Sequence, residues 1–226
     1  MSIEILKRED MHYGGFAGLR EHRLVMGRQI FGFHAEPETW DGIGNFVYLA
    51  DAKFNPHGDT RMHPHHEIDV LTIMVDGTLN HEGSLENGET IETGDIQVQR
   101  AGGEGFEHNE INPADTKNRM LQFWVLPETK GEPASYKLHK NPAEKVTSIY
   151  GGLNADDLFK SRTVIDVINL KPNEEYQVNK QSLLYIFQGN GFVDDKKVED
   201  GNLLRCNKYI IKAQTDMKFF MVSLMK

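Results

Sequence analysis

Val70-Leu71-Thr72-Ile73-Met74-Val75-Asp76-Gly77 is the stretch that decides the fold of this chain. Its first six residues form the longest clean apolar run, and several of them are β-branched, as strand residues often are. The Asp-Gly pair that follows is a strong turn signal. Because a membrane-spanning helix needs about 18 or more apolar residues, this run predicts a strand and not a span.

Short apolar runs alternate with glycine turns in both directions from this stretch. Further runs occupy residues 120–126, 163–170, 183–187 and 219–224, and Ile96 to Gln99 alternates with the period of a half-buried strand. Only Asn154 to Lys160 predicts a helix, a short one with an Asn cap. The turns between the runs include Asn87-Gly88, Thr93-Gly94-Asp95, Gly102-Gly103, Gly189-Asn190-Gly191 and Asp200-Gly201. These patterns predict an all-β protein.

The length of 226 residues lies between one and two domains of about 150 residues each. The segment from Pro127 to Val146 is polar and predicts a connecting arm. Leu71 to Asp95 and Leu184 to Asn207 share the order strand, glycine turn, strand and acidic glycine turn. We therefore expect two jelly-roll-like β-barrels in tandem, with one domain over residues 1–135 and the other over 145–226.

Composition narrows the classes of function. The chain has 25 Lys and Arg against 34 Asp and Glu, a net charge of -9, which argues against direct nucleic-acid binding. A single cysteine, Cys206, excludes an internal disulfide and fits a reducing compartment. The first ten residues are charged and contain no signal-peptide core. We expect a cytoplasmic protein that does not bind a membrane.

The densest group of metal-binding side chains begins at His63-Pro64-His65, and all ten histidines lie at or before His139. Alternate residues of a strand share a face, so His63 and His65 point the same way. Pro64 favours an extended backbone and a place at a sheet edge. On the same alternation, His66 faces away, whereas Glu67 and Asp69 share the histidine face and are candidates to bind a metal or orient an imidazole.

A second pair, His108 and Glu110, follows a glycine-rich stretch and has the same spacing. A single H-x-H sequence more often consists of exposed polar residues than of ligands. Two such pairs in one all-β half favour a metal site of three imidazoles and one carboxylate. That donor set suits Fe(II), Mn(II), Ni(II) or Cu(II) and leaves coordination positions open.

The sequence resembles the pirin family of the cupin superfamily over about residues 45 to 135. The motifs that carry the resemblance are His63-Pro64-His65, Asp69 with Val70-Leu71-Thr72, Gly77-Thr78-Leu79-Asn80-His81, Ser84-Leu85-Glu86-Asn87-Gly88, Gly94-Asp95-Ile96-Gln97, Ala101-Gly102, Gly105-Phe106-Glu107-His108-Asn109-Glu110 and Met120-Leu121-Gln122-Phe123-Trp124-Val125-Leu126-Pro127-Glu128.

This resemblance implies a bicupin with one mononuclear metal in the N-terminal barrel and a C-terminal barrel without ligands. The implied ligands are His63, His65, His108 and Glu110, and the implied metal is Fe(II), with Mn, Ni, Cu or Zn as alternatives. Several bacterial members of the family that this sequence resembles act as quercetin dioxygenases. The implied reaction is ring cleavage of a flavonol or related enol by O₂, with Glu110 also serving as catalytic base. His81 is expected to border the barrel.

Two other functions stay open on the sequence. The family includes proteins that bind transcription factors or metabolic enzymes, which would make this chain a metal-dependent regulatory module with a protein partner and no catalytic activity. The remaining alternative is a cupin with a structural role only.

Overall fold

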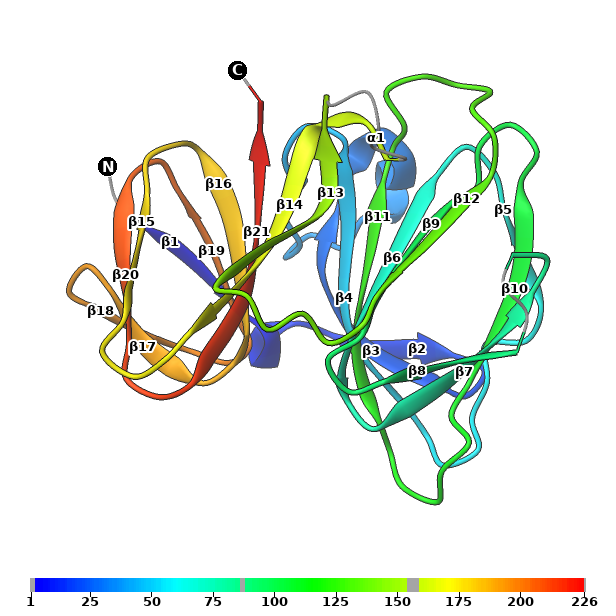
Figure 1. Cartoon of the computed structure of the whole chain (residues 1–226), viewed down its shortest axis with the longest axis horizontal. Coiled ribbons are helices and arrows are strands. Elements are labelled where there is room, and N and C mark those ends of the chain that lie inside the picture. Colours follow the sequence, from blue (N-terminus) through cyan, green and yellow to red (C-terminus); the bar gives the residue numbers. More distant parts are fainter. Residues whose placement is uncertain (1–2, 86–87, 154–158, 226) are drawn as a thin grey trace. The chain divides into compact units, whose positions relative to one another are not determined.

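The computed structural model describes residues 3–85, 88–153 and 159–225, and they form four β-sheets (Figure 1). The strands of each sheet pair in antiparallel fashion. The chain divides into two compact units, and each contains two of the sheets. The predicted all-β, two-barrel architecture is confirmed.

The N-terminal unit, Met11–Pro142, contains a seven-stranded sheet in the order β12-β9-β6-β11-β4-β3-β2 and a four-stranded sheet in the order β5-β10-β7-β8. Its strands are β2 (Tyr13–Phe16), β3 (Leu19–Met26), β4 (Phe46–Phe54), β5 (His63–His65), β6 (Asp69–Asp76), β7 (Thr78–Gly83), β8 (Glu89–Glu92), β9 (Ile96–Arg100), β10 (Phe106–Ile111), β11 (Arg119–Val125) and β12 (Ser135–His139). The helices α1 (Arg28–Phe31) and η2 (Gly32–His34) lie between β3 and β4 in the chain.

The C-terminal unit joins Met1–Asp10 to Ala143–Lys226, and its sheets have the orders β1-β19-β16-β21-β14-β13 and β15-β20-β17-β18. A short helix, η1 (Arg8–Asp10), follows its first strand. The strands are β1 (Glu4–Lys7), β13 (Val146–Gly152), β14 (Ser161–Leu170), β15 (Glu175–Val178), β16 (Ser182–Gln188), β17 (Asn190–Val193), β18 (Lys196–Glu199), β19 (Asn202–Cys206), β20 (Tyr209–Ala213) and β21 (Met217–Leu224).

The first ten residues, which the sequence division placed with residues 1–135, lie in the C-terminal unit. β1 pairs with β19, and Ile5 lies opposite Leu204. Ile3 and Ile5 pack against the apolar core of this unit. A short strand gains stability from a paired edge and a buried face. The segment therefore pairs with the C-terminal sheet, although more than 190 residues separate Ile5 from Leu204 in the chain.

The polar arm expected over Pro127–Val146 contains a strand. β12 pairs with β9 and forms the edge of the seven-stranded sheet. The arm thus extends the N-terminal sheet before the chain enters the second unit. The short helix expected over Asn154 to Lys160 falls mainly on residues 154–158, which lie outside the described residues.

The Val70–Val75 run forms most of β6, an interior strand between β9 and β11. Gly77 makes the predicted turn with φ 84°, and a Cβ there would lie 2.9 Å from the Cβ of Asn118. An apolar cluster closes one end of the barrel interior; it consists of Leu19, Ala52, Phe54, Met74, Leu79, Ile91 and Met120. This cluster fills that end of the N-terminal barrel with packed apolar side chains.

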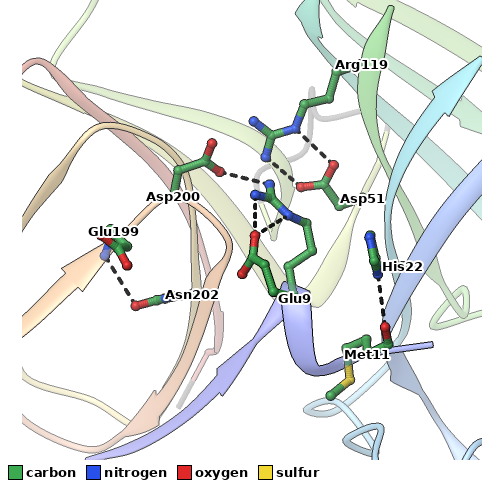
Figure 2. A network of polar contacts seen from close by, with 9 residues as sticks. Glu9, Met11, His22, Asp51, Arg119, Glu199, Asp200 and Asn202 are labelled. Carbon is green, nitrogen blue, oxygen red and sulfur yellow. Dashed lines mark hydrogen bonds and ion pairs between the residues drawn. The ribbon is translucent and has the colours of Figure 1, made fainter. Parts of the chain in front are cut away.

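Two arginine–carboxylate pairs join strands of the seven-stranded sheet. Arg100 on β9 donates to both carboxylate oxygens of Asp69 on β6, and it also pairs with Glu132 at 2.9 Å. Arg119 on β11 binds both oxygens of Asp51 on β4 at 2.9 and 2.6 Å (Figure 2). Bidentate pairs fix both distance and orientation, so they set how these strands lie beside each other.

The core of the C-terminal barrel is almost entirely aliphatic and aromatic, with residues such as Leu184, Ile211 and Phe219. Its turn after β18 is held by the backbone N–H of Glu199, which donates to the Asn202 side chain at 3.2 Å (Figure 2). Among the described residues, no helix is long and apolar enough to cross a membrane.

Arg100→Met tests the buried ion pair. Because Asp69 is fully buried, the substitution leaves a carboxylate without its main partner, and we expect the free energy of unfolding to fall by about 3–5 kcal/mol. Urea denaturation measures this loss. The matched control is Arg28→Met, which removes an exposed pair with Asp41 and should cost less than about 1 kcal/mol. Equal losses in both variants would contradict the assignment.

Candidate metal centre

Three imidazoles meet where β5 lies beside β10. His63 is paired in register with His108, and His65 with Phe106. The Nε2 atom of His108 lies 3.0 Å from Nε2 of His63 and 3.1 Å from Nε2 of His65. The ligand atoms of the three residues all lie within 4.8 Å of one another. The structure thus brings His108 together with the two histidines that strand alternation predicts to share a face.

The local sequence explains how β5 presents its two histidines. β5 is an edge strand of the four-stranded sheet, as Pro64 predicts. Before it, Arg61 turns the chain with φ 61°, and its carbonyl accepts a hydrogen bond from Nδ1 of His63 at 2.8 Å. A proton on Nδ1 leaves Nε2 of His63 with a free lone pair that points at the other two histidines.

The nitrogen spacing fits a single metal ion. Two nitrogens bound to one ion at right angles, each at about 2.1 Å, lie about 3.0 Å apart. The observed separations of 3.0 and 3.1 Å match this value. Moreover, Nδ1 of His108 is buried and has no partner among the described residues. A divalent cation placed among the three Nε2 atoms would accept the lone pair of each of them at once.

Burial also keeps the imidazoles of His65 and His108 neutral. Desolvation, followed by the neighbouring histidines, lowers the pKa of His108 to about 2. Desolvation and His63 lower the pKa of His65 to about 4. Both rings are therefore unprotonated at neutral pH, which is the form that binds metals.

Glu110 lies on the same face of β10 as His108, deeper in the barrel and fully buried. Its carboxylate accepts a hydrogen bond from the Thr72 hydroxyl at 3.3 Å and from the Gln122 amide at 3.2 Å. Burial raises the pKa of Glu110 to about 7. In this structure the carboxylate is held by β6 and β11, and it does not belong to the group of ligand atoms formed by the three histidines.

The expectation that Glu67 and Asp69 share the histidine face is wrong. The chain leaves β5 after His65, and Glu67 has φ 51°, so the strand alternation does not continue. An oxygen of Glu67 accepts from the backbone N–H of Gly131 at 2.9 Å, and Asp69 binds Arg100. His66 faces away as predicted, and its Nε2 donates to the carbonyl of Gly103 at 3.0 Å.

His81 is buried beside the cluster. It pairs in register with Glu110 across β7 and β10, and its ring centroid lies 5.4 Å from that of His108. Its Nε2 donates to the Leu85 carbonyl at 3.0 Å. Close approach of the two strands depends on Gly83, where a Cβ would lie 2.4 Å from the Glu107 carbonyl oxygen. His81 therefore lines the barrel next to the candidate site.

Sequence reasoning missed three residues that shape the site. Thr72 and Gln122 hold Glu110, and the half-buried Trp124 lies edge-on to His65, with ring centroids 6.0 Å apart. Thr72 and Gln122 are the polar positions inside two apolar runs. A polar residue at the core-facing position of such a run is the signal that could have found them.

The fold and the histidine cluster define this chain as a two-barrel cupin with a candidate metal centre in its N-terminal barrel. The description of the Pirin family matches residues 28–125, which contain all three histidines. The predicted resemblance to the pirin family is thereby confirmed over this segment of the chain.

Two relatives and two solved structures are similar to this chain. The chain is 32% identical over 123 residues to ZMO1337 of Zymomonas mobilis, covering 53% of this chain and 51% of that protein. It is 36% identical over 76 residues to the quercetin 2,3-dioxygenase of Escherichia coli K12, covering 33% and 32%. The matches therefore span about a third to a half of these relatives.

The crystal structure of YhhW from Escherichia coli has a TM-score of 0.85 at 20% identity and covers 99% of this chain and 98% of YhhW. A nickel(II) complex of the same protein, described as a bacterial pirin, has a TM-score of 0.83 at 20% identity, with 99% of each chain covered. At this identity the likeness shows the fold, and it extends over both units.

Glu110→Gln tests the burial of the carboxylate in metal-free protein. The folded pKa of Glu110 is raised to about 7 from 4.5, so this group's contribution is present below pH 4.5 and lost as the pH rises through 7. Relative to Glu110→Gln, the wild type should lose about 3 kcal/mol of unfolding free energy between these pH values. Urea denaturation across this range measures the difference, in which the histidine contributions cancel. A difference that does not change with pH would contradict the prediction.

His108→Ala tests the centre itself. It removes the nitrogen that lies within 3.1 Å of both other ligand atoms, and we expect nickel(II) affinity to fall by more than about 100-fold, since losing even an outer partner costs about 10- to 100-fold. Calorimetric titration measures the affinity, and circular dichroism checks the fold. His57→Ala, which alters an exposed histidine paired with Asp115, should bind like the wild type. Unchanged affinity in His108→Ala would refute the assignment.

Proposed function

We propose that this chain is a metal-dependent dioxygenase of the quercetin 2,3-dioxygenase type, which cleaves a flavonol or a related enol with O₂. The observation that carries the proposal is the convergence of three Nε2 atoms within a barrel, beside a buried carboxylate. Three nitrogen ligands leave positions open for substrate and O₂ on a six-coordinate ion. The name of the E. coli relative and the nickel complex of YhhW support the same class of activity and a divalent metal.

In this proposal His63, His65 and His108 hold the metal, and Glu110 is the fourth ligand. The metal supplies Lewis acidity that makes the substrate hydroxyl more acidic, together with redox chemistry toward O₂. Fe(II) is the metal we propose, and Mn(II), Ni(II), Cu(II) and Zn(II) also fit the donor set. The Arg61 carbonyl, which fixes the tautomer of His63, would keep that ligand oriented.

Glu110 is also the base that takes the proton from the flavonol hydroxyl. Glu110 is buried beside the three histidines, so a substrate held at the metal would lie within reach of its carboxylate. Thr72 and Gln122 would orient its two oxygens and hold the carboxylate after it receives the proton. Phe106 and Trp124, whose rings contact His65, would exclude water from the reacting oxygen species.

Oxygen uptake tests this function. The protein is loaded with Fe(II) without oxygen, bound iron is quantified, and uptake is recorded after quercetin is added. We expect uptake in proportion to bound iron, loss of uptake in His108→Ala, and wild-type uptake in His57→Ala. Bound iron without uptake, on quercetin and on a panel of enediols, would overturn the catalytic proposal. The same result would favour the regulatory alternative, in which the metal controls binding of a protein partner.

A further inference from the structure

An aromatic pair connects the histidine cluster to a second buried carboxylate, that of Glu21, which lies on the same face of the seven-stranded sheet. Trp124 on β11 lies opposite Tyr48 on β4, and their rings stack with centroids 4.5 Å apart at 29°. Phe31 from α1 covers the pair, with its ring 5.9 Å from Trp124 and 5.7 Å from Tyr48. With this cover Tyr48 is buried and Trp124 is half-buried.

One end of the pair reaches the candidate metal centre. The Trp124 ring meets His65 edge-on at 6.0 Å between centroids. From His65 to Trp124 to Tyr48, each step is 6.0 Å or less between ring centroids. Two neighbouring rings at such distances exchange an electron readily, because their π-systems are separated by only a few ångströms.

The other ring of the pair, Tyr48, is bonded to a proton acceptor, the carboxylate of Glu21. The Tyr48 hydroxyl donates to Oε2 of Glu21 at 2.9 Å, and both residues are at most 5% exposed. A carboxylate at this depth needs partners, and Arg23 supplies a second one at 3.7 Å. Arg23 in turn binds Glu36 at 2.9 Å, and both of these side chains are about a quarter exposed. The polar chain therefore runs from Tyr48 to the surface.

The chemistry of these groups suits one-electron transfer. Tryptophan and tyrosine are the protein side chains that give up one electron most easily. Oxidised tyrosine releases its phenolic proton, so a hydrogen-bonded carboxylate beside the hydroxyl lowers the barrier to oxidation. Packing alone explains a stacked Trp–Tyr pair, but it does not explain why the phenol is bonded to a buried carboxylate, which is costly to bury.

We propose that Trp124, Tyr48 and Glu21 form a one-electron relay between the histidine cluster and the polar chain at the surface. The inference rests on the metal of the proposed function, but not on its substrate. When peroxide oxidises a metal held by the three histidines, Trp124 would supply one electron and Tyr48 would then return one electron to the tryptophan radical cation. At the same time the Tyr48 proton moves to Glu21, leaving a neutral tyrosyl radical. A soluble reductant such as a thiol or ascorbate restores Tyr48.

The relay would protect the ligand histidines. When oxidising equivalents arise without substrate to consume them, they pass to Tyr48 and do not attack the imidazoles.

Tyr136 is a natural comparison within the same barrel. Its hydroxyl also donates to a carboxylate, Glu89, at 2.5 Å, and its ring lies 6.3 Å from His81. No tryptophan stands between Tyr136 and the ligand histidines in the part of the chain that the structure describes, so we expect it to lie off the path.

Freeze-quench electron paramagnetic resonance tests the relay in iron(II)-loaded protein treated with hydrogen peroxide. Each peroxide takes one electron from iron, one from the relay and two protons from solvent, giving two waters. We expect a tyrosyl radical signal in the wild type and in Tyr136→Phe, and no such signal in Tyr48→Phe. In Trp124→Phe and Glu21→Gln the signal should form roughly tenfold more slowly, with bound iron unchanged.

Mass spectrometry of the same samples gives a second readout. Oxidation of His63, His65 and His108 should be greater in Tyr48→Phe than in the wild type and in Tyr136→Phe. A radical signal that persists in Tyr48→Phe or disappears in Tyr136→Phe would overturn the relay. Should Tyr48→Phe not fold, Glu21→Gln keeps the phenol and an acceptor oxygen, and wild-type radical kinetics in that variant would overturn the proposal. The radical signal and the histidine oxidation are measured without quercetin. A protein that fails the oxygen-uptake test can therefore still show the relay, and the two proposals are tested separately.

Discussion

The register of β5 against β10 is the constraint on which the rest of the N-terminal barrel depends. It places His63 opposite His108 and His65 opposite Phe106, and Nε2 of His108 then lies 3.0 Å from Nε2 of His63 and 3.1 Å from Nε2 of His65. Neutral lone pairs directed at one point repel one another, and burial withholds the water that would separate them. The surrounding strands must hold this arrangement, and the edge position of β5 and the Arg61 carbonyl contribute to it.

The interior of this barrel is graded from apolar to polar. The cluster that contains Phe54 and Met120 fills one end, and Thr72, Glu110 and Gln122 form a hydrogen-bonded layer between it and the histidines. The apolar end supplies burial energy, roughly 25 cal/mol for each Å² removed from water. That energy offsets the cost of the buried carboxylate and imidazoles, so the base of the barrel stabilises a site that would otherwise destabilise it.

The two barrels differ in the side chains that fill their interiors. The C-terminal core is filled by aliphatic and aromatic side chains such as Leu184 and Phe219. The same β architecture therefore surrounds a candidate metal centre in one barrel and an apolar core in the other. Polar residues on interior strand faces, and not the fold, distinguish the two.

The sequence by itself determined the strand content, the two barrels and the set of three histidines, because strand alternation and turn residues act over a few neighbours. It also indicated the edge position of β5 through Pro64. Tertiary structure was needed to show where Glu4–Lys7 pairs, that Asp69 binds Arg100, and that Trp124 lies between His65 and Tyr48. These outcomes depend on the register between strands far apart in the chain and on a positive φ at Glu67, neither of which a local pattern specifies.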